Sequence, residues 1–357
     1  MQSRIQASRP FRHHGGTGAM IAVALVNLAL SIATLSIWRF WGRTKVRRLL
    51  WSGVTAWDDP VEYTGTGGEL FKGFLVALVV IYLPLLGLYT WAQALVVSGD
   101  PLGTILLSVL YPLTVFLIAA GAYRARRYQL SRTLWRGIRG GQTGSAWGYA
   151  LRSMAVWLLL PLTLGWVWPW GEMWLARYRL DNTCFGDRRF CCDAGVAGLY
   201  GRFAVAWLCI MAYVGLVSLL FVQTFLDSMQ TGELDEAAAP MIPVMLLGAV
   251  IVMTLPWAWY RAGFYRAMAG GTTFEGARFS AQVTTWTLIR LSIGNGLISL
   301  FSLGVLRPWV ALRIFRFACG VLAVDGVPDF AGIRQGWDKG PKTGEGMVSV
   351  LDGVGEF

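Results

Sequence analysis

Charged residues are scarce in this sequence, and so are histidine and cysteine. Only 14% of the 357 residues are charged, whereas 55% are hydrophobic. A soluble chain would carry about 25% charged residues. The composition therefore excludes an ordinary soluble domain and favours a protein whose solvent is partly the lipid bilayer.

Patterns for catalysis and metal binding are also missing from the sequence. No Ser-His-Asp set, phosphate-binding loop or zinc-protease pattern occurs. The cysteines include a C-x6-C-C run at 184–192, which is not a known ligand spacing, and neither His13 nor His14 lies near it. We therefore expect no enzymatic activity, no catalytic residue, no metal and no cofactor.

Long apolar runs are present instead. The mean hydropathy is +0.52, and several runs approach the ~20 residues that cross a bilayer as a helix. Many of the 18 tryptophans flank these runs, as in the aromatic belts of membrane proteins. The basic N-terminus is followed by no clear cleavage site, so we expect the first apolar segment to be retained. The sequence predicts an all-α, polytopic membrane protein.

One element occurs three times in the chain. It reads T-L-S-I-W-R-F-W at 34–41, T-L-G-W-V-W-P-W at 163–170 and S-L-G-V-L-R-P-W at 302–309, and it closes an apolar segment each time. An internal duplication explains this constant pattern. The repeated motif comprises Trp41, Pro169, Trp170, Pro308 and Trp309.

The motif-bearing segments alternate with two long apolar hairpins. If A is a motif segment and B a hairpin, the chain reads A-B-A-B-A, an internal repeat of the kind found in transporter folds. Small polar inserts with a strand-like alternation follow the motif segments. We predict repeat 1 at 11–122, repeat 2 at 123–260, half repeat 3 at 261–335 and a flexible tail at 336–357.

The positive charges predict a topology. All Lys and Arg residues lie outside the windows 73–123 and 203–260, each of which contains one hairpin and its turn. The positive-inside rule therefore places the turns at Gly99 and Gly232 outside, and both termini and all the polar inserts in the cytoplasm. The charge of +11 thus orients the chain in the membrane, and we expect no nucleic-acid partner.

The motif segments carry arginine on both flanks. The simplest topology is that each segment enters the membrane and returns to the cytoplasmic side, with the break at Thr/Ser-Leu-Gly/Ser and Pro-Trp opening the returning helix. The alternative is a plain seventh span that violates the rule locally. We expect Trp41, Trp170 and Trp309 at the cytoplasmic interface.

These features resemble a known family. The T-L-G-x-x-x-P-W segment followed by basic residues, the R-G-I-R run before Thr-Gly-Ser and the duplication are similar to the YjgN family of bacterial inner-membrane proteins, whose function is unknown. The resemblance extends to about Gln335 and implies a multi-pass protein of the bacterial inner (cytoplasmic) membrane. It brings no substrate. The first copy has Ser36 for Gly and Phe40 for Pro, so an identical bend there is not implied.

The leading functional hypothesis is a solute or ion permease or channel. Asn27 and Asn295 occupy equivalent positions before their motifs, and an amide in the membrane must face protein or water. A transport path requires the two amides to approach one another or a common cavity; the alternative is that they bind neighbouring helices. The candidate path-lining residues are Asn27, Asn295, Thr34, Thr163 and Ser302.

The rival hypothesis is a non-transporting scaffold that recruits partners or anionic lipid through its Arg-rich inserts. Arg124, Arg126 and Arg127 are candidate contacts for lipid headgroups, unless this cluster only determines topology. Glu172 follows the second motif without an equivalent in the other copies, and we expect it to form an interfacial ion pair with Arg177 or Lys45.

Overall fold

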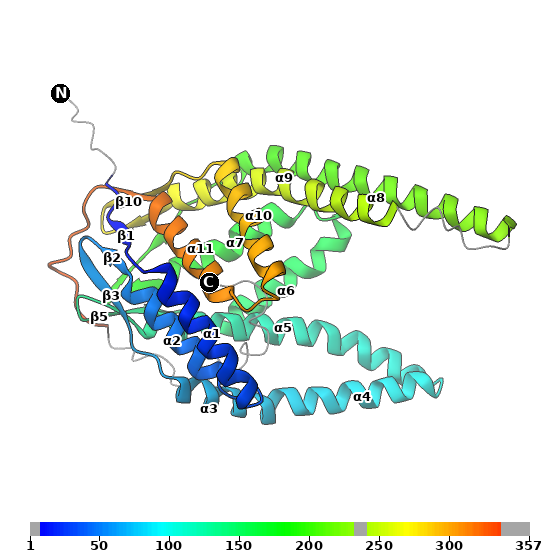
Figure 1. Cartoon of the computed structure of the whole chain (residues 1–357), viewed down its shortest axis with the longest axis horizontal. Helices are drawn as coiled ribbons and strands as arrows, with labels where there is room; N and C mark the ends of the chain where they lie inside the picture. The colour runs from blue at the N-terminus through cyan, green and yellow to red at the C-terminus, as the bar shows by residue number, and fades with distance from the viewer. Residues whose placement is uncertain (1–7, 232–240, 337–357) are drawn as a thin grey trace.

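The computed structural model describes residues 8–231 and 241–336 (Figure 1). Its strands gather at one end of the molecule, helices form the middle, and two long helical hairpins project from the other side. The predicted external turn at Gly232, and the predicted tail beyond Gly336, lie outside the described residues.

Three short helical hairpins contain the repeated motif, and we call them motif hairpins 1, 2 and 3. In each, two consecutive helices pack against one another, and short connections join the open end to strands. The helices are α1 (Thr17–Ala33) and α2 (Arg39–Ser52), α6 (Ala146–Leu162) and α7 (Trp168–Asp181), and α10 (Thr285–Phe301) and α11 (Arg307–Val321).

All three tips have the same backbone bend. Leu164 and Gly165 take the left-handed conformation with φ of 49° and 86°, and Leu303 and Gly304 do so with 49° and 80°. In motif hairpin 1, Leu35 and Ser36 make this bend with φ of 49° and 68°. Ser36 therefore replaces glycine without changing the turn, although a residue with a Cβ is strained in this region.

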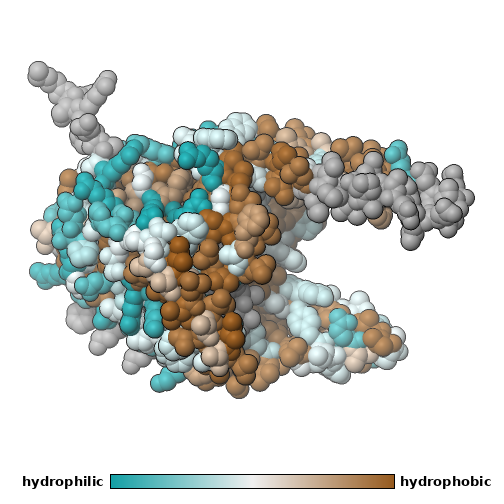
Figure 2. Space-filling model, viewed as in Figure 1, coloured by the Kyte–Doolittle hydropathy of each residue, from teal (hydrophilic) through white to brown (hydrophobic). Residues whose placement is uncertain are grey.

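The tips are apolar and stand out from the protein. Leu35 is 89% exposed, Leu303 is 92% exposed and Leu162 is 80% exposed. In water, an exposed leucine side chain loses the free energy that it would gain from an apolar environment. Figure 2 shows the wider pattern, with hydrophilic residues over the strand end and hydrophobic residues over the helices and their hairpins.

The first long hairpin begins with three helical pieces in line. They are α3 (Gly67–Ala77), the π-helical turn η1 (Leu78–Tyr82) and α4 (Leu83–Val97). Pro84 has no N–H to donate to the carbonyl one turn back, which accounts for an irregular turn just before it. The hairpin is completed by α5 (Pro101–Ser131), which packs along α4.

The second long hairpin pairs α8 (Ala197–Thr231) with α9 (Met241–Gly270). Within the described residues, three helices are long and apolar enough to cross a membrane: Gly67–Val97, Pro101–Ser131 and Ala197–Gln223. The prediction of a mostly helical, polytopic membrane protein is confirmed at this level.

The fold is mostly helical, and the inserts that were predicted to be strand-like form antiparallel strands. They are β1 (Phe11–His13), β2 (Val54–Ala56), β3 (Asp59–Tyr63), β4 (Thr133–Trp135), β5 (Ile138–Gln142), β6 (Thr183–Phe185), β7 (Arg188–Arg189), β8 (Cys191–Cys192), β9 (Thr272–Phe274), β10 (Ala277–Ala281) and β11 (Leu322–Asp325). One sheet has the order β1-β2-β3-β4-β5-β6-β7 and the other β11-β10-β9-β8, with antiparallel pairs throughout.

The two sheets join at both edges and close into what we call the β ring. At one junction, the chain passes from β7 to β8 through Phe190, whose N–H donates to the Thr183 carbonyl at 3.0 Å. At the other, Ser8 exchanges two backbone hydrogen bonds with Val324 of β11, at 3.0 and 2.9 Å, and then leads into β1. Closure removes the exposed sheet edges that would otherwise pair with other chains.

The strands cross the predicted repeat boundaries. β3 of repeat 1 pairs with β4 of repeat 2, and β8 of repeat 2 pairs with β9 of half repeat 3. The helical layer below also closes on itself, since α2 packs on α3, α5 on α6, α7 on α8 and α9, α9 on α10, and α11 on α1. The predicted repeats therefore do not fold as separate domains.

The tips offer a test of the shared bend. Ser36→Gly should stabilise the folded protein by about 1 kcal/mol and Gly165→Ala should destabilise it by about 1 kcal/mol, because only glycine adopts this conformation without strain. Melting temperatures of the purified protein measure both. Gly296→Ala is the control, since this exposed helical glycine has open space around it. An unchanged melting temperature for Gly165→Ala would contradict the assigned bend.

Candidate functional site

The three hydroxyls proposed to line a path are used in the hairpin tips. Thr34 Oγ1 donates to the Leu30 carbonyl at 2.7 Å and accepts from the Trp38 N–H at 2.9 Å. Thr163 repeats this with Leu159 and Val167, and Ser302 Oγ accepts from the Leu306 N–H at 3.2 Å. These groups satisfy backbone polar atoms that the bend leaves open.

Asn27 joins the two helices of its own hairpin. Its Nδ2 donates to the Gly42 carbonyl at 3.3 Å, and its Oδ1 accepts from Trp38 Nε1 at 3.2 Å. Gly42 is needed at this crossing, because a Cβ there would lie 3.0 Å from the Asn27 side chain. This is the helix–helix contact weighed above as the alternative to a path.

The equivalent positions in the other hairpins differ chemically. Val156 packs against Gly171, where an added Cβ would clash with it. Asn295 has a buried Oδ1 with no hydrogen-bond partner among the described residues. One cavity lies beside α11 and another lies inside the β ring, and neither is lined by the candidate path residues Asn27, Asn295, Thr34, Thr163 and Ser302.

The motif prolines and tryptophans open the returning helices. Pro169 and Pro308 are second in α7 and α11, where proline costs no hydrogen bond. Trp170 stacks on Trp174 with ring centroids 4.9 Å apart, and Trp41 lies 5.7 Å from Phe71. Trp309 packs on the cluster between α1, α2 and α11.

The motif tryptophans thus lie near the hairpin tips, at the start of the returning helices, and their position at the cytoplasmic interface stays a prediction. The 14-residue helix α2 is about 21 Å long, and it separates the tip from the β ring.

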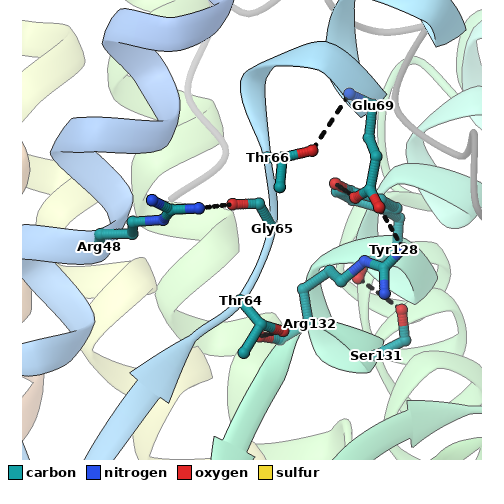
Figure 3. Close-up of polar contacts among 8 residues, drawn as sticks. All are labelled: Arg48, Thr64, Gly65, Thr66, Glu69, Tyr128, Ser131 and Arg132. Carbon is teal, nitrogen blue, oxygen red and sulfur yellow. Dashed lines mark hydrogen bonds and ion pairs between the residues drawn. The ribbon is translucent and has the colours of Figure 1, made fainter.

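A polar cluster ties the first insert to the first long hairpin (Figure 3). Thr66 caps α3 by accepting from the Glu69 N–H at 3.3 Å. The Glu69 carboxylate accepts from Tyr128 at 2.6 Å and from Arg132 at 2.8 Å. Arg48 of motif hairpin 1 donates to the Gly65 carbonyl at 2.9 Å. The cluster is a structural clamp.

Glu172 forms a second clamp, with a partner that the sequence did not indicate. Its carboxylate accepts from Tyr260 at 2.8 Å and makes an ion pair with Arg261. The expected partners were Arg177 and Lys45, but Arg177 donates to the Ala194 carbonyl and Lys45 lies over the Trp38 ring at 4.8 Å. The pairing of α7 with α9 decides this, and it is invisible in local sequence.

The proposed lipid contacts lie at the strand end of α5. Arg124 is exposed, and Arg126 and Arg127 are half-buried. Arg124 is thus the member of this group most open to a lipid headgroup.

A basic pocket of about 500 Å³ lies where the N-terminal segment meets α11, close to the β ring. Arg9, Arg12, His13 and His14 line it from one side, and Arg316 lines it from the other. Arg12 lies 3.8 Å from Asp58, with both side chains exposed, and an ion pair of this kind is weak. We call this the basic pocket.

The fixed arginine of the pocket is Arg316. It donates to Thr17 Oγ1 at 3.1 Å and to the Gly15 carbonyl, so it anchors the start of α1 while facing the pocket. Sequence analysis missed this site because about 300 residues separate its two sides. The only local signal was the run of Arg9, Arg12 and two histidines.

His13 is held neutral in this site. Its Nε2 lies 3.2 Å from the Leu50 carbonyl and its Nδ1 accepts from the Gly15 N–H at 3.0 Å, which requires the Nε2–H tautomer. Burial lowers the pKa of His13 below 6.5 and the Arg316 charge lowers it further, although the Leu50 carbonyl raises it. A proton on Nδ1 would break the Gly15 contact.

Residues 8–350 match the family described as bacterial protein of unknown function DUF898. The chain belongs to the DUF898 family. Over 139 residues, 30% are identical to the inner membrane protein YjgN of Salmonella typhimurium strain LT2, a match that covers 38% of this chain and 32% of that protein. Over 134 residues, 32% are identical to YjgN of Escherichia coli O157:H7, covering 37% and 30%.

The predicted resemblance to YjgN proteins is thus confirmed. The matched part of the chain spans about a third of the length of these curated relatives. No solved structure matches the chain. With its apolar helices, this DUF898 member is a multi-pass protein of the bacterial inner membrane.

The neutral His13 predicts a pH effect on stability. Because the folded pKa is lowered, this histidine stabilises the fold above pH 6.5 and the contribution is lost as pH falls through the folded value. The melting temperature should therefore drop between pH 7 and 5, and His13→Gln should reduce that drop. The exposed neighbour His14, changed to Gln, is the matched control. An equal pH dependence in both variants would refute the role of His13.

Proposed function

We propose that this DUF898 member is a non-transporting, non-enzymatic scaffold of the inner membrane that binds anionic phospholipid at its cytoplasmic face. The observation that carries the proposal is the basic pocket, in which cations from two distant segments converge at the strand end of α1 and α11. The proposal includes the A-B-A-B-A repeat, with the β ring in the cytoplasm and the motif hairpins re-entrant.

Three features support re-entry. The first helix of each motif hairpin has 17 residues, about 25 Å, whereas the hydrocarbon core is about 30 Å thick. Each returning helix leads back to the same β ring. The exposed leucines at the tips suit lipid and not water. A hairpin of this length would reach into the bilayer without crossing it.

Single-cysteine labelling tests this topology. In a cysteine-free background, an impermeant thiol reagent added from the periplasmic side should modify cysteine at position 99 and spare positions 58, 187 and 329. Permeabilised cells should show labelling at all four positions, which controls for accessibility. Labelling at 58 or 187 from outside would refute re-entry and favour the plain seventh span.

The chemistry of the basic pocket suits a phosphate group. Guanidinium groups bind phosphate oxygens through paired, charge-assisted hydrogen bonds. With the ring in the cytoplasm, the start of α1 and the end of α11 lie at headgroup level, where anionic lipids attract cations. Arg12 is the side chain best placed to engage a lipid, because Arg9 donates to Gln282 and Arg316 to Thr17.

Transport is the second candidate, and one observation favours it. The buried Asn295 Oδ1 has no hydrogen-bond partner among the described residues, and a buried amide oxygen is costly when unpaired. Asn27 argues against a path, because its Nδ2 and its Oδ1 both form hydrogen bonds within its own hairpin. The scaffold is therefore the better supported of the two.

Lipid titration distinguishes the two functions. Arg12→Gln should weaken binding of phosphatidylglycerol to the detergent-solubilised protein about fivefold, since one cation near anionic lipid contributes about 1 kcal/mol. Native mass spectrometry measures the bound fraction. Arg189→Gln is the control, because this exposed arginine of β7 lies outside the pocket. Equal loss in both variants would refute a specific site, and solute flux in reconstituted vesicles would favour the permease.

A further inference from the structure

The β ring encloses an apolar cavity that the proposed scaffold role does not use. Its volume is about 280 Å³, and no polar atom faces it. Eight of the lining side chains are aromatic, contributed by strands of both sheets and by the segment after β11; they include Phe11, Trp57, Trp135, Phe185, Phe274 and Phe330. We call this cavity the aromatic chamber.

The polar residues of the wall turn their hydroxyls away from the chamber. Thr133 Oγ1 donates to the Gln129 carbonyl at 2.9 Å and accepts from Trp51 at 3.0 Å. Thr183 Oγ1 donates to the Arg179 carbonyl at 2.7 Å. Trp135 Nε1 is likewise used, on the Ala56 carbonyl at 3.0 Å. With its polar atoms committed elsewhere, the chamber can recognise only an apolar group.

The chamber has a floor and a mouth. Leu130 of α5 and Thr133 lie on the side of the helices. The opposite side carries the two-residue turns Trp57–Asp58 and Arg136–Gly137, whose residues all have positive φ. The mouth therefore faces away from the helical layer and, in the proposed topology, away from the membrane.

Phe330 stands in this mouth. Its ring centroid lies 4.8 Å from that of Trp135 and 5.0 Å from that of Trp57, and the Arg136 guanidinium lies 5.4 Å from it. Phe330 belongs to the G-V-P-D-F-A-G insert, which is neither helix nor strand.

The segment that carries Phe330 is held by the buried side chains of Pro328 and Ile333 and by a few hydrogen bonds. Asp187 and Arg334 exchange two hydrogen bonds, at 2.9 and 3.1 Å, and Gln335 accepts from the Arg139 N–H at 2.8 Å. Arg334 and Gln335 lie at the surface in these contacts. Moving Phe330 exposes few side chains beyond this short segment, so its local opening costs less than the global unfolding of the protein.

We propose that the aromatic chamber is a binding site for a small, uncharged aromatic molecule, which enters from the cytoplasmic side when Phe330 moves out of the mouth. An aromatic guest fits because its ring can meet the edges and faces of the wall. Dry apolar cavities of comparable size bind such molecules. A lipid acyl chain is not the guest, because the mouth faces away from the bilayer.

Fluorobenzene, followed by fluorine NMR line broadening, tests the site in the full-length protein in nanodiscs. Wild type should broaden the signal more than Ala56→Leu, whose longer side chain fills the chamber and should weaken binding by about tenfold or more. The broadening caused by probe dissolved in lipid is the same for both proteins, so the difference between them reports binding to the chamber. Charged 4-fluorobenzoate should show no difference between the two proteins.

A second pair of measurements keeps the test independent of one variant. Val61→Phe fills the chamber from another strand and should give the same loss. Phe330→Ala should keep binding and speed exchange of the probe, since the mouth stands open. Equal broadening by wild type and a folded filled variant would overturn the site, and unchanged exchange in Phe330→Ala would overturn the entry route. Neither result depends on lipid binding at Arg12.

Discussion

The structure depends on closure of the β ring. The strands are two to five residues long, and pairs this short are marginal on their own. Closure gives each strand neighbours and leaves no sheet edge for aggregation. Because every helical hairpin begins or ends at a strand, the ring also fixes the order of the helices below it. The Ser8–Val324 pair completes the strand layer, and the packing of α11 on α1 completes the helical layer.

The helical layer was largely predictable, because its signals are local. Apolar length predicted the long hairpins, and the repeated motif predicted the break at the tips. The bend at Ser36 was the exception, since the sequence did not imply the same turn there and the structure has it. The packing of the whole hairpin requires this turn geometry, and it holds Ser36 at a positive φ despite the strain.

The ring and the sites could not be predicted, because they are made of distant partners. A strand of two or three residues has too little alternation for a periodic signal. Glu172 finds Arg261 only after α7 and α9 pack together, and Arg316 joins Arg12 only after α11 packs on the N-terminal segment. Thr34 and Thr163, which were predicted to line a path, bond to the backbone of the turn, and the sequence did not indicate this use.

The ring closure has a consequence for how the chain is made. Ser8 and Val324 are 316 residues apart, so the closing contact carries a high sequence separation and a corresponding entropic delay. Synthesis proceeds at about 5 to 20 residues per second. The hairpins therefore enter the membrane before β11 has been made, and the first strands lack this partner until then. The strand layer must therefore persist as an open sheet with an unpaired edge for roughly tens of seconds. The aromatic side chains of the future chamber are exposed during that time, which is when the nascent protein is most exposed to chaperones and to aggregation.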